Sequence, residues 1–225
     1  MQFLEANARR IVIKIGTHSL TGPRGRFQTE RIRDLCGQIA SLRNNGFEVI
    51  LVSSGAVGMG VGQIGLAQRP TDLTGLQACA AIGQSRLMEA WQAALEEFDI
   101  TAAQVLLTRE DVRGRRRHLA VRNTLERLLS YGVVPVVNEN DTVSADEIKF
   151  GDNDILSALV ASLLKADLLV ILSTIPGLME DQGKGALIPV VEEINDEIRA
   201  MAGDSESEHA TGGMITEVFV MDAQG

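Results

Sequence analysis

The sequence contains few of the residues that build disulfide frameworks and protein-bound metal centres. Its 225 residues include only two cysteines and three histidines. Cys36 and Cys79 lie in helical patterns without the spacing of a zinc site or a redox pair, so we expect buried thiols in a reducing compartment. His18, His118 and His209 are far apart in the chain and offer no metal-ligand spacing. The sequence therefore predicts no metal site built by the protein alone.

The sequence also lacks an excess of positive charge and any apolar run long enough to cross a bilayer. Its 21 Lys and Arg residues are outnumbered by 30 Asp and Glu residues, and the net charge is −9. This balance argues against general binding to nucleic acid or to a membrane surface. Residues 1–10 lack the basic start and the apolar stretch of a signal peptide. We therefore expect a cytoplasmic protein without a transmembrane helix.

Neither of two common nucleotide-binding motifs supports a nucleotide site in this sequence, because one is absent and the other is a weak match. The sequence contains no G-x-x-x-x-G-K-[ST], which excludes a P-loop enzyme. Residues 60–65 match G-x-G-x-x-G, but the match begins several residues after the preceding strand pattern. No acidic residue near position 82 is available to bind a ribose. We therefore reject the dinucleotide-binding oxidoreductase that this motif alone would indicate.

Strand and helix patterns alternate along the whole chain, which predicts an α/β fold. Most strand patterns are continuous apolar runs, which are typical of a parallel sheet covered on both faces. They lie at residues 11–17, 48–52, 100–107, 133–137 and 168–172. Residues 74–98 predict a long helix interrupted near Gly83, with Trp91 in the core. Whether Gln77, Gln84 and Ser85 of this helix face a ligand is left open by the sequence.

Two clusters of Asn and Asp flank one loop after the 133–137 strand. The first, Asn-Glu-Asn-Asp at 138–141, follows the strand directly, and the second, Gly-Asp-Asn-Asp at 151–154, leads into a helix pattern. Asp152 or Asn153 could simply cap that helix. The alternative is a binding site, because ligands of open α/β sheets bind at the carboxyl ends of the strands. The pairing of two such clusters favours the site.

The first strand pattern carries a lysine, Lys14, among β-branched residues. A lysine at an exposed sheet edge would protect against aggregation, whereas a buried one needs an anion. Gly16 and Thr17 follow it, Ser53-Ser54-Gly55 ends the second strand as an anion-binding turn, and Ser173-Thr174 ends the fifth. In a parallel sheet these strand ends meet the acidic cluster. A buried lysine, glycine turns and carboxylates suit phosphoryl transfer, in which carboxylates hold Mg²⁺ or orient cations.

Seven segments, taken in order, resemble the glutamate 5-kinase branch of the amino acid kinase family. They are IVIKIGTHSLT, VILVSSGAVGMG, QACAAIGQSRLM, LLTREDV, VVPVVNENDTV, EIKFGDNDILSALVA and ATGGM. The resemblance extends from about residue 10 to residue 216. It implies a three-layer αβα sandwich with a mainly parallel central sheet. It also implies ATP- and Mg²⁺-dependent phosphorylation of the side-chain carboxylate of L-glutamate, the first step of proline synthesis.

The resemblance assigns roles to individual residues. Lys14 would bind the phosphates and stabilise the transferring group, and Asp154 would orient the catalytic lysines. Ser54, Asp141 and Asn153 would bind glutamate. The residues along ATP would be Lys14, Gly16, Thr17, Ser173, Thr174, Thr211, Gly212, Gly213, Met214 and Glu217. Family members form dimers or tetramers and are inhibited by proline, so we expect both properties here.

The sequence departs from the family pattern at several places. Thr216-Glu217 stands where the family has Thr-Lys, and the Lys is a second catalytic cation. A carboxylate there would raise the barrier by roughly several kcal/mol. Ser173-Thr174 replaces Ser/Thr-Asp. Residues 1–225 therefore resemble one kinase domain without its last helix and strand, and without the RNA-binding-type (PUA) domain that many members carry. The alternative function is a non-catalytic glutamate- or proline-binding remnant of a glutamate kinase.

Overall fold

The structure is a computed structural model that describes residues 9–20, 28–143, 152–174, 177–180 and 185–201. Its centre is a five-stranded sheet in the order β3-β4-β2-β1-β5, and every strand pair is parallel. The strands are β1 (Arg10–Ile15), β2 (Glu48–Ser53), β3 (Ala102–Leu107), β4 (Val134–Glu139) and β5 (Leu168–Leu172). The α/β fold and the parallel sheet predicted from the apolar runs are confirmed.

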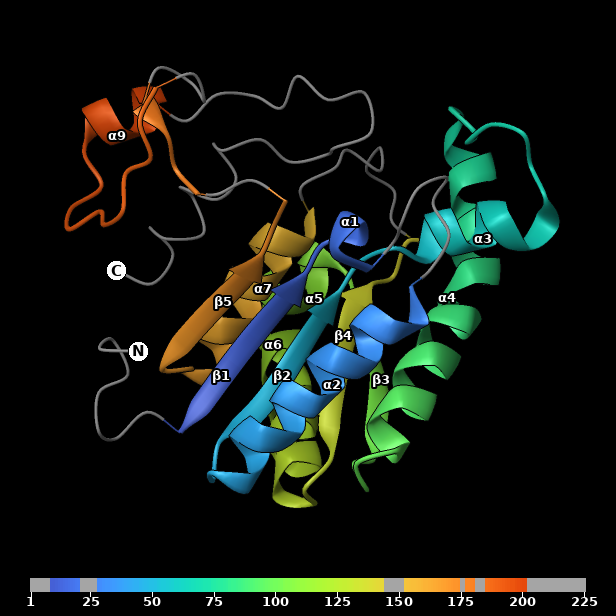
Figure 1. Ribbon diagram of the computed structural model, residues 1–225, viewed down its shortest axis with the longest axis horizontal. Helices are drawn as coiled ribbons and strands as arrows, with labels where there is room; N and C mark the ends of the chain where they lie inside the picture. The colour runs from blue at the N-terminus through green and yellow to red at the C-terminus, as the bar shows by residue number, and fades with distance from the viewer. Residues whose placement is uncertain (1–8, 21–27, 144–151, 175–176, 181–184, 202–225) are drawn as a thin grey trace.

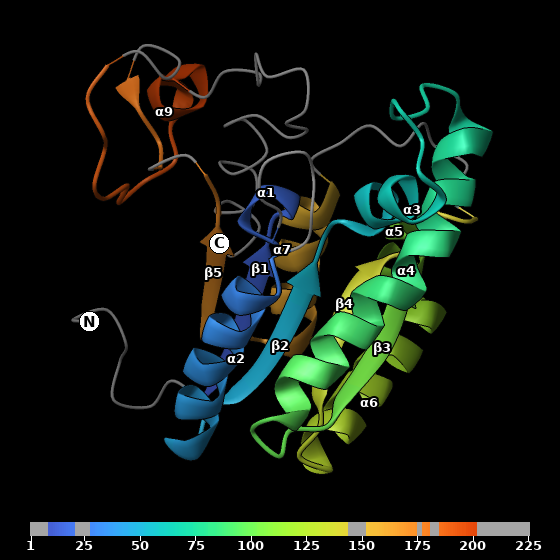
Figure 2. The ribbon, with the colours of Figure 1, turned by 45° about the vertical axis from the view of Figure 1, so that its right-hand side comes forward.

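Helices cover both faces of the sheet and give the predicted three layers (Figures 1 and 2). Ile11, Ile13 and Ile15 of β1 pack in one apolar cluster with the helices of the first face, whereas Val12 packs in the cluster of the other face. This alternation explains the continuous apolar runs, because both sides of each strand are buried. The first face carries α2 (Thr29–Asn44) and α4 (Leu73–Glu96), and the second carries α6 (Arg115–Ser130) and α7 (Asp152–Leu164).

The carboxyl ends of the five strands share one edge of the sheet, because all strands are parallel. The helices that follow β1, β2, β3 and β4 along the chain all begin at this edge, and the longest of them is α7 (Figure 1). The shorter ones are α1 (Thr17–Leu20), α3 (Ala56–Ile64) and α5 (Arg109–Arg113). The sequence did not predict α5, whose start is a capping box between Thr108 and Asp111. The fold therefore gathers the predicted strand-end residues in one region.

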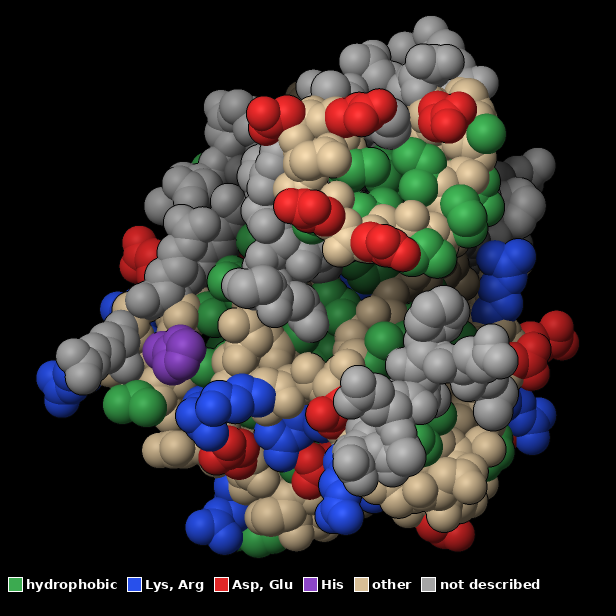
Figure 3. All heavy atoms as spheres, turned by 90° about the vertical axis from the view of Figure 1, so that its left-hand side faces the viewer, with side chains coloured by type: hydrophobic (Ala, Val, Ile, Leu, Met, Phe, Trp, Pro, Cys, Tyr) green, Lys and Arg blue, Asp and Glu red, His purple; other side chains and the backbone are tan. Residues whose placement is uncertain are grey.

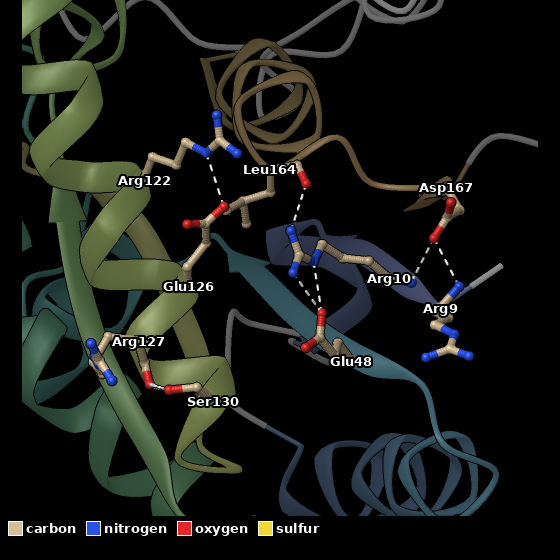
Figure 4. A network of polar contacts seen from close by, with 9 residues as sticks. All are labelled: Arg9, Arg10, Glu48, Arg122, Glu126, Arg127, Ser130, Leu164 and Asp167. Carbon is tan, nitrogen blue, oxygen red and sulfur yellow. Dashed lines mark hydrogen bonds and ion pairs between the residues drawn. The ribbon is translucent and has the colours of Figure 1, made fainter.

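Polar contacts link the elements at the opposite edge of the sheet, where the strands begin (Figure 4). The Arg10 guanidinium pairs with Glu48 at 2.7 Å and donates to the Leu164 carbonyl at 2.6 Å, so it joins β1 to β2 and α7. Asp167 accepts hydrogen bonds from the backbone N–H groups of Arg9 and Arg10, each at 2.8 Å. These two bonds lower the pKa of the Asp167 carboxyl. The first strand is thus held in register at its start, far from the strand-end residues.

Glycines set the contact between α3 and α4. A Cβ atom on Gly60 would lie 1.9 Å from the Cys79 carbonyl oxygen, and one on Gly83 would lie 1.8 Å from the Ala56 carbonyl oxygen. The predicted interruption near Gly83 is wrong, because α4 continues through it. Gly83 serves close packing rather than a break. Gly60 of the G-x-G-x-x-G match lies inside α3 for the same reason, so this motif forms no phosphate-binding turn.

The described part of residues 177–201 forms a small unit with its own apolar cluster. Leu178 is buried there against four partly buried residues, which are Ile188, Val191, Ile194 and Ile198. A single antiparallel bridge joins Met179 to Leu187, and a short helix, α9 (Asp196–Met201), follows. Figure 3 shows carboxylates gathered around an apolar centre. The exposed acidic residues of this unit are Glu180, Glu192, Glu193, Asp196 and Glu197.

None of the helices described here is long and apolar enough to span a membrane.

Candidate functional site

Lys14 forms the buried ion pair at the centre of the site. Its ammonium nitrogen pairs with Asp154 Oδ1, and the side chains are 11% and 7% exposed. The alternative of a protective edge lysine is wrong, because β1 lies between β2 and β5, and Lys14 is paired with Val52 and Ile171. Two charges this deeply buried are stable only when each has a partner. The site therefore keeps a cation and a carboxylate together below its surface.

Asn153 binds the end of β2 instead of capping α7. Its Nδ2 donates to Ser54 Oγ at 2.7 Å and to Asn138 Oδ1 at 3.1 Å, with a longer contact to the Ser53 carbonyl oxygen at 3.4 Å. The capping interpretation is therefore wrong for Asn153, whereas the Asp152 side chain lies outside the described residues. Asn153 and Ser54, predicted to bind the same ligand, are in direct contact.

A chain of side-chain amides continues from this contact to α4. Asn138 Nδ2 donates to Gln84 Oε1 at 2.8 Å, and Asn138 Oδ1 accepts from the Glu139 N–H at 2.9 Å. Asn138 and Gln84 are 2% and 9% exposed. Neither had been assigned as a site residue. Asn138 belongs to the Asn-Glu-Asn-Asp cluster, and this could have identified it as a site residue. Nothing in the helical pattern indicated which strand end Gln84 faces.

A left-handed glycine and two hydrogen bonds fix the turn after β2, which was predicted to bind an anion. Gly55 precedes α3 with φ = 112° and ψ = 0°, which is left-handed backbone that favours glycine. The Ser54 N–H donates to the Ile15 carbonyl at 3.1 Å, and Ser53 Oγ accepts from the Trp91 indole N–H at 2.9 Å. These bonds hold the turn against β1 and the core. The amino end of α3 therefore meets that of α7, and both carry partial positive charge.

Gly16 and Thr17 place the end of β1 beside the other strand ends. The Gly16 N–H donates to the Leu172 carbonyl at 3.3 Å, which ties this turn to β5. A Cβ atom on Gly16 would lie 3.6 Å from the Lys14 ammonium nitrogen, so Gly16 is a near neighbour of the cation. Thr17 begins α1, and its Oγ1 would lie 4.0 Å from a Cβ atom on Gly55. The turns after β1 and β2 are thus adjacent.

Asp141 follows β4 and lines a separate part of the site. It borders a pocket of about 240 Å³ together with residues of α4, β3 and the turn after β4. These are Ala80, Ala81, Gln84, Ser85, Gln104, Leu106, Asn140 and Thr142. Burial, and secondarily repulsion by Glu139, raise the pKa of the Asp141 carboxyl to about 6, although Arg69 partly offsets this. The pocket therefore holds a carboxyl that is mostly ionised only when the pH is above about 6.

The remaining predicted residues are placed only in part. Ser173 and Thr174 follow β5 and are exposed beside the turn after β1. Thr211, Gly212, Gly213, Met214 and Glu217 lie outside the described residues. Within the described ranges, no three His, Cys, Asp or Glu side chains gather in a way that could hold a metal ion. The described geometry thus joins Lys14, Asp154, Asn153 and Ser54, with Asp141 in the adjoining pocket.

Comparison with known proteins gives one consistent family. The model of the amino acid kinase family matches residues 9–220. Glutamate 5-kinases from Myxococcus xanthus and Carboxydothermus hydrogenoformans are 50% and 48% identical over 94% and 97% of this chain, which spans 57% and 60% of their lengths. A glutamate 5-kinase from Clostridium acetobutylicum is 46% identical over 95% of this chain, which spans 81% of that protein.

A solved structure extends the comparison to the fold. Carbamate kinase from Giardia lamblia bound to AMP-PNP superposes with a TM-score of 0.62, covering 98% of this chain and 91% of that one. The two sequences are only 17% identical, so this likeness shows the fold alone. It agrees with the three-layer arrangement described above.

Proposed function

The chain belongs to the amino acid kinase family, and from this premise we propose that it transfers the terminal phosphoryl group of ATP to the side-chain carboxylate of L-glutamate. A glutamate carboxylate oxygen attacks the phosphorus, the bond from phosphorus to the ADP oxygen breaks, and glutamyl 5-phosphate and ADP result. The observation that carries the proposal is the buried Lys14–Asp154 pair beside Asn153 and Ser54. Glutamate-dependent formation of ADP is the test.

Lys14 supplies the positive charge that this reaction requires. Its ammonium offsets the negative charge that spreads over the transferring phosphoryl oxygens. Asp154 orients the ammonium through the ion pair, so the cation is in place before ATP binds. The N–H groups at the amino ends of α3 and α7 add donors for anionic groups. A fixed cation and fixed donors lower the barrier without reorganisation during the reaction.

Glutamate is proposed to lie between Asp141 and the Ser54–Asn153 contact. The Asp141 carboxylate binds the ammonium of the amino acid, and Ser54 and Asn153 bind its polar groups nearer Lys14. This arrangement uses the strand-end groups of β2 and β4 for the substrate. The end of β1 is then left for the nucleotide.

ATP is proposed to lie along the turns after β1 and β5. Gly16 and Thr17 approach its phosphates, and Ser173 and Thr174 lie beside it. From the family resemblance alone, we propose that Thr211, Gly212, Gly213, Met214 and Glu217 also bind the nucleotide. Mg²⁺ is proposed to arrive on the ATP phosphates and to keep much of its water, since Asp154 is already paired with Lys14.

Glu217 favours a second candidate function. A carboxylate at the position where the family has a catalytic lysine opposes the charge that develops on the phosphoryl group. A chain that binds glutamate or proline without turning over ATP would have this combination of an intact glutamate side and an altered ATP side. Glutamate binding without ADP formation distinguishes this candidate from the kinase.

Four further properties belong to the proposal through the family alone. We propose that the protein acts in the cytoplasm, in proline biosynthesis, as a homodimer or homotetramer. Proline is proposed to inhibit it by feedback. Light scattering of the purified chain, and glutamate binding measured with and without proline, test the assembly and the inhibition.

Glutamate binding is expected to weaken in acid because of Asp141. With a pKa of about 6, this carboxyl loses its charge as the pH falls, and it then binds an ammonium poorly. The glutamate side-chain carboxyl, with an ordinary pKa of about 4.3, is still mostly ionised at pH 5, and its other groups titrate outside this range. The dissociation constant at pH 5 is therefore expected to be about tenfold higher than at pH 7.5. Titration calorimetry at four pH values measures this.

The Asp141→Asn variant is the control, and its weaker binding should not change over the same pH range. A dissociation constant of the original chain that is also constant would contradict the placement of the ammonium at Asp141. In the ligand-free chain, the raised pKa means that folding favours the protonated carboxyl. Its stabilising contribution is present below the ordinary value of 3.8 and is lost as the pH rises through about 6.

A further inference from the structure

Gln84 of α4 carries a buried donor without a partner at the wall of the Asp141 pocket. The residue is 9% exposed and lines the pocket. Its Oε1 accepts from Asn138 Nδ2 at 2.8 Å, whereas its Nε2 has no hydrogen-bond partner among the described residues. Buried polar groups are nearly always hydrogen-bonded in folded proteins. An orphan donor beside a ligand pocket therefore indicates a ligand acceptor.

The amide of Gln84 cannot be turned around to remove the orphan donor. Asn138 Oδ1 already accepts from the Glu139 N–H at 2.9 Å and from Asn153 Nδ2 at 3.1 Å. Asn138 must therefore donate from its Nδ2 to Gln84, and Gln84 must accept this hydrogen bond with its Oε1. The Glu139 backbone N–H can only donate, so it fixes Asn138 Oδ1 and thereby which end of the Gln84 amide is left over.

The pocket opposes this donor with a carboxylate. Asp141 lines the same pocket and attracts a cation once ionised, and Ser85 and Thr142 also line it as small polar residues. The Gln84 donor can bind the α-carboxylate of an amino acid, and the Asp141 carboxylate can bind its α-ammonium. A ligand with an ammonium alone would leave the Gln84 donor unsatisfied.

We propose that Gln84 Nε2 donates a hydrogen bond to the α-carboxylate of the amino acid whose ammonium is bound by Asp141. Gln84 then determines specificity for an α-amino acid over an amine that lacks the α-carboxylate. This inference rests on the proposed function, because it takes glutamate as the ligand. It adds a residue of α4 to a site otherwise built from strand ends and α7.

The test compares glutamate with 4-aminobutyrate, which has the same amino group and side-chain carboxylate but no α-carboxylate. The Gln84→Glu variant keeps an oxygen for Asn138 and replaces the donor by a carboxylate. At pH 8 we expect its dissociation constant for glutamate to rise at least about tenfold, with that for 4-aminobutyrate unchanged within about twofold. Gln84→Met, which removes the donor without adding charge, should weaken glutamate selectively as well. Titration calorimetry gives both constants.

Gln92→Glu is the matched control, because Gln92 is an exposed residue of the same helix outside the pocket. It adds the same charge to α4 and should leave both dissociation constants unchanged. Equal weakening of glutamate and 4-aminobutyrate in the Gln84 variants would assign Gln84 a structural function and overturn the inference. Unchanged glutamate binding in both variants would also overturn it. An original chain that binds no glutamate would overturn the proposed function itself, a result distinct from either.

Discussion

Replacing Lys14 by Met is expected to abolish phosphoryl transfer and also to destabilise the folded chain. The variant loses the cation that we propose offsets charge on the transferring group, and kcat should fall at least about a thousandfold. It also leaves the Asp154 carboxylate buried without its partner, at a cost of about 3–5 kcal/mol in the free energy of unfolding. Formation of ADP and urea denaturation measure the two effects.

A second substitution separates catalysis from stability. In the double variant Lys14→Met, Asp154→Leu, no buried charge is left over, and an apolar pair in place of an ion pair is often neutral for stability. We expect this variant to regain most of the lost unfolding free energy while remaining inactive. Turnover comparable to that of the original chain in either variant would refute the catalytic assignment of Lys14.

Replacing Gly83 by Ala is expected to be the most damaging change of a single methyl group. The added Cβ would lie 1.8 Å from the Ala56 carbonyl oxygen and 2.4 Å from the Gly60 nitrogen, and both are backbone atoms that cannot rotate away. The start of α3 must then move, together with the turn at Gly55. We expect the free energy of unfolding to fall by at least about 3 kcal/mol. Thermal and urea denaturation measure it.

Gly62→Ala is the matched control, because Gly62 lies in α3 with no atom within 4 Å of an added Cβ. Alanine is a better helix former than glycine, so this variant should gain up to about 1 kcal/mol. Gly83→Ala should also lose glutamate affinity, since Ser54 precedes the displaced turn. If the two variants had equal stability, the close packing of α3 on α4 would not explain why position 83 requires glycine.

The fold could be predicted from the sequence because its apolar patterns are repetitive. The 168–172 run was predicted as a strand and is found as β5 (Leu168–Leu172), since a strand buried on both faces leaves a continuous apolar pattern. The interruption predicted at Gly83 failed for a tertiary reason. A glycine inside a helix has the same local signal whether it breaks the helix or admits a neighbouring one, and only the position of α3 decides.

The candidate site could be predicted where it lies at strand ends. Lys14 stood out because an apolar strand offers a lysine no solvent, and the structure supplies its partner, Asp154. Gln84 could not be recognised in this way. Its place depends on the packing of α4 against β4, and its donor is orphaned only because Asn138 is held by two other groups. Such a chain of contacts is a property of the tertiary structure.

Glutamate-dependent formation of ADP from Mg-ATP, measured for the chain and for its Glu217→Lys variant, tests the central claim most directly. The account predicts ADP formation that requires glutamate in both proteins. It also predicts that the variant is at least about tenfold faster, because a cation then replaces a carboxylate at a position that we propose lies beside the transferring group. If neither protein forms ADP in the presence of glutamate, although both are folded and bind glutamate, the proposed kinase activity is contradicted. The alternative of a non-catalytic glutamate-binding protein would then remain.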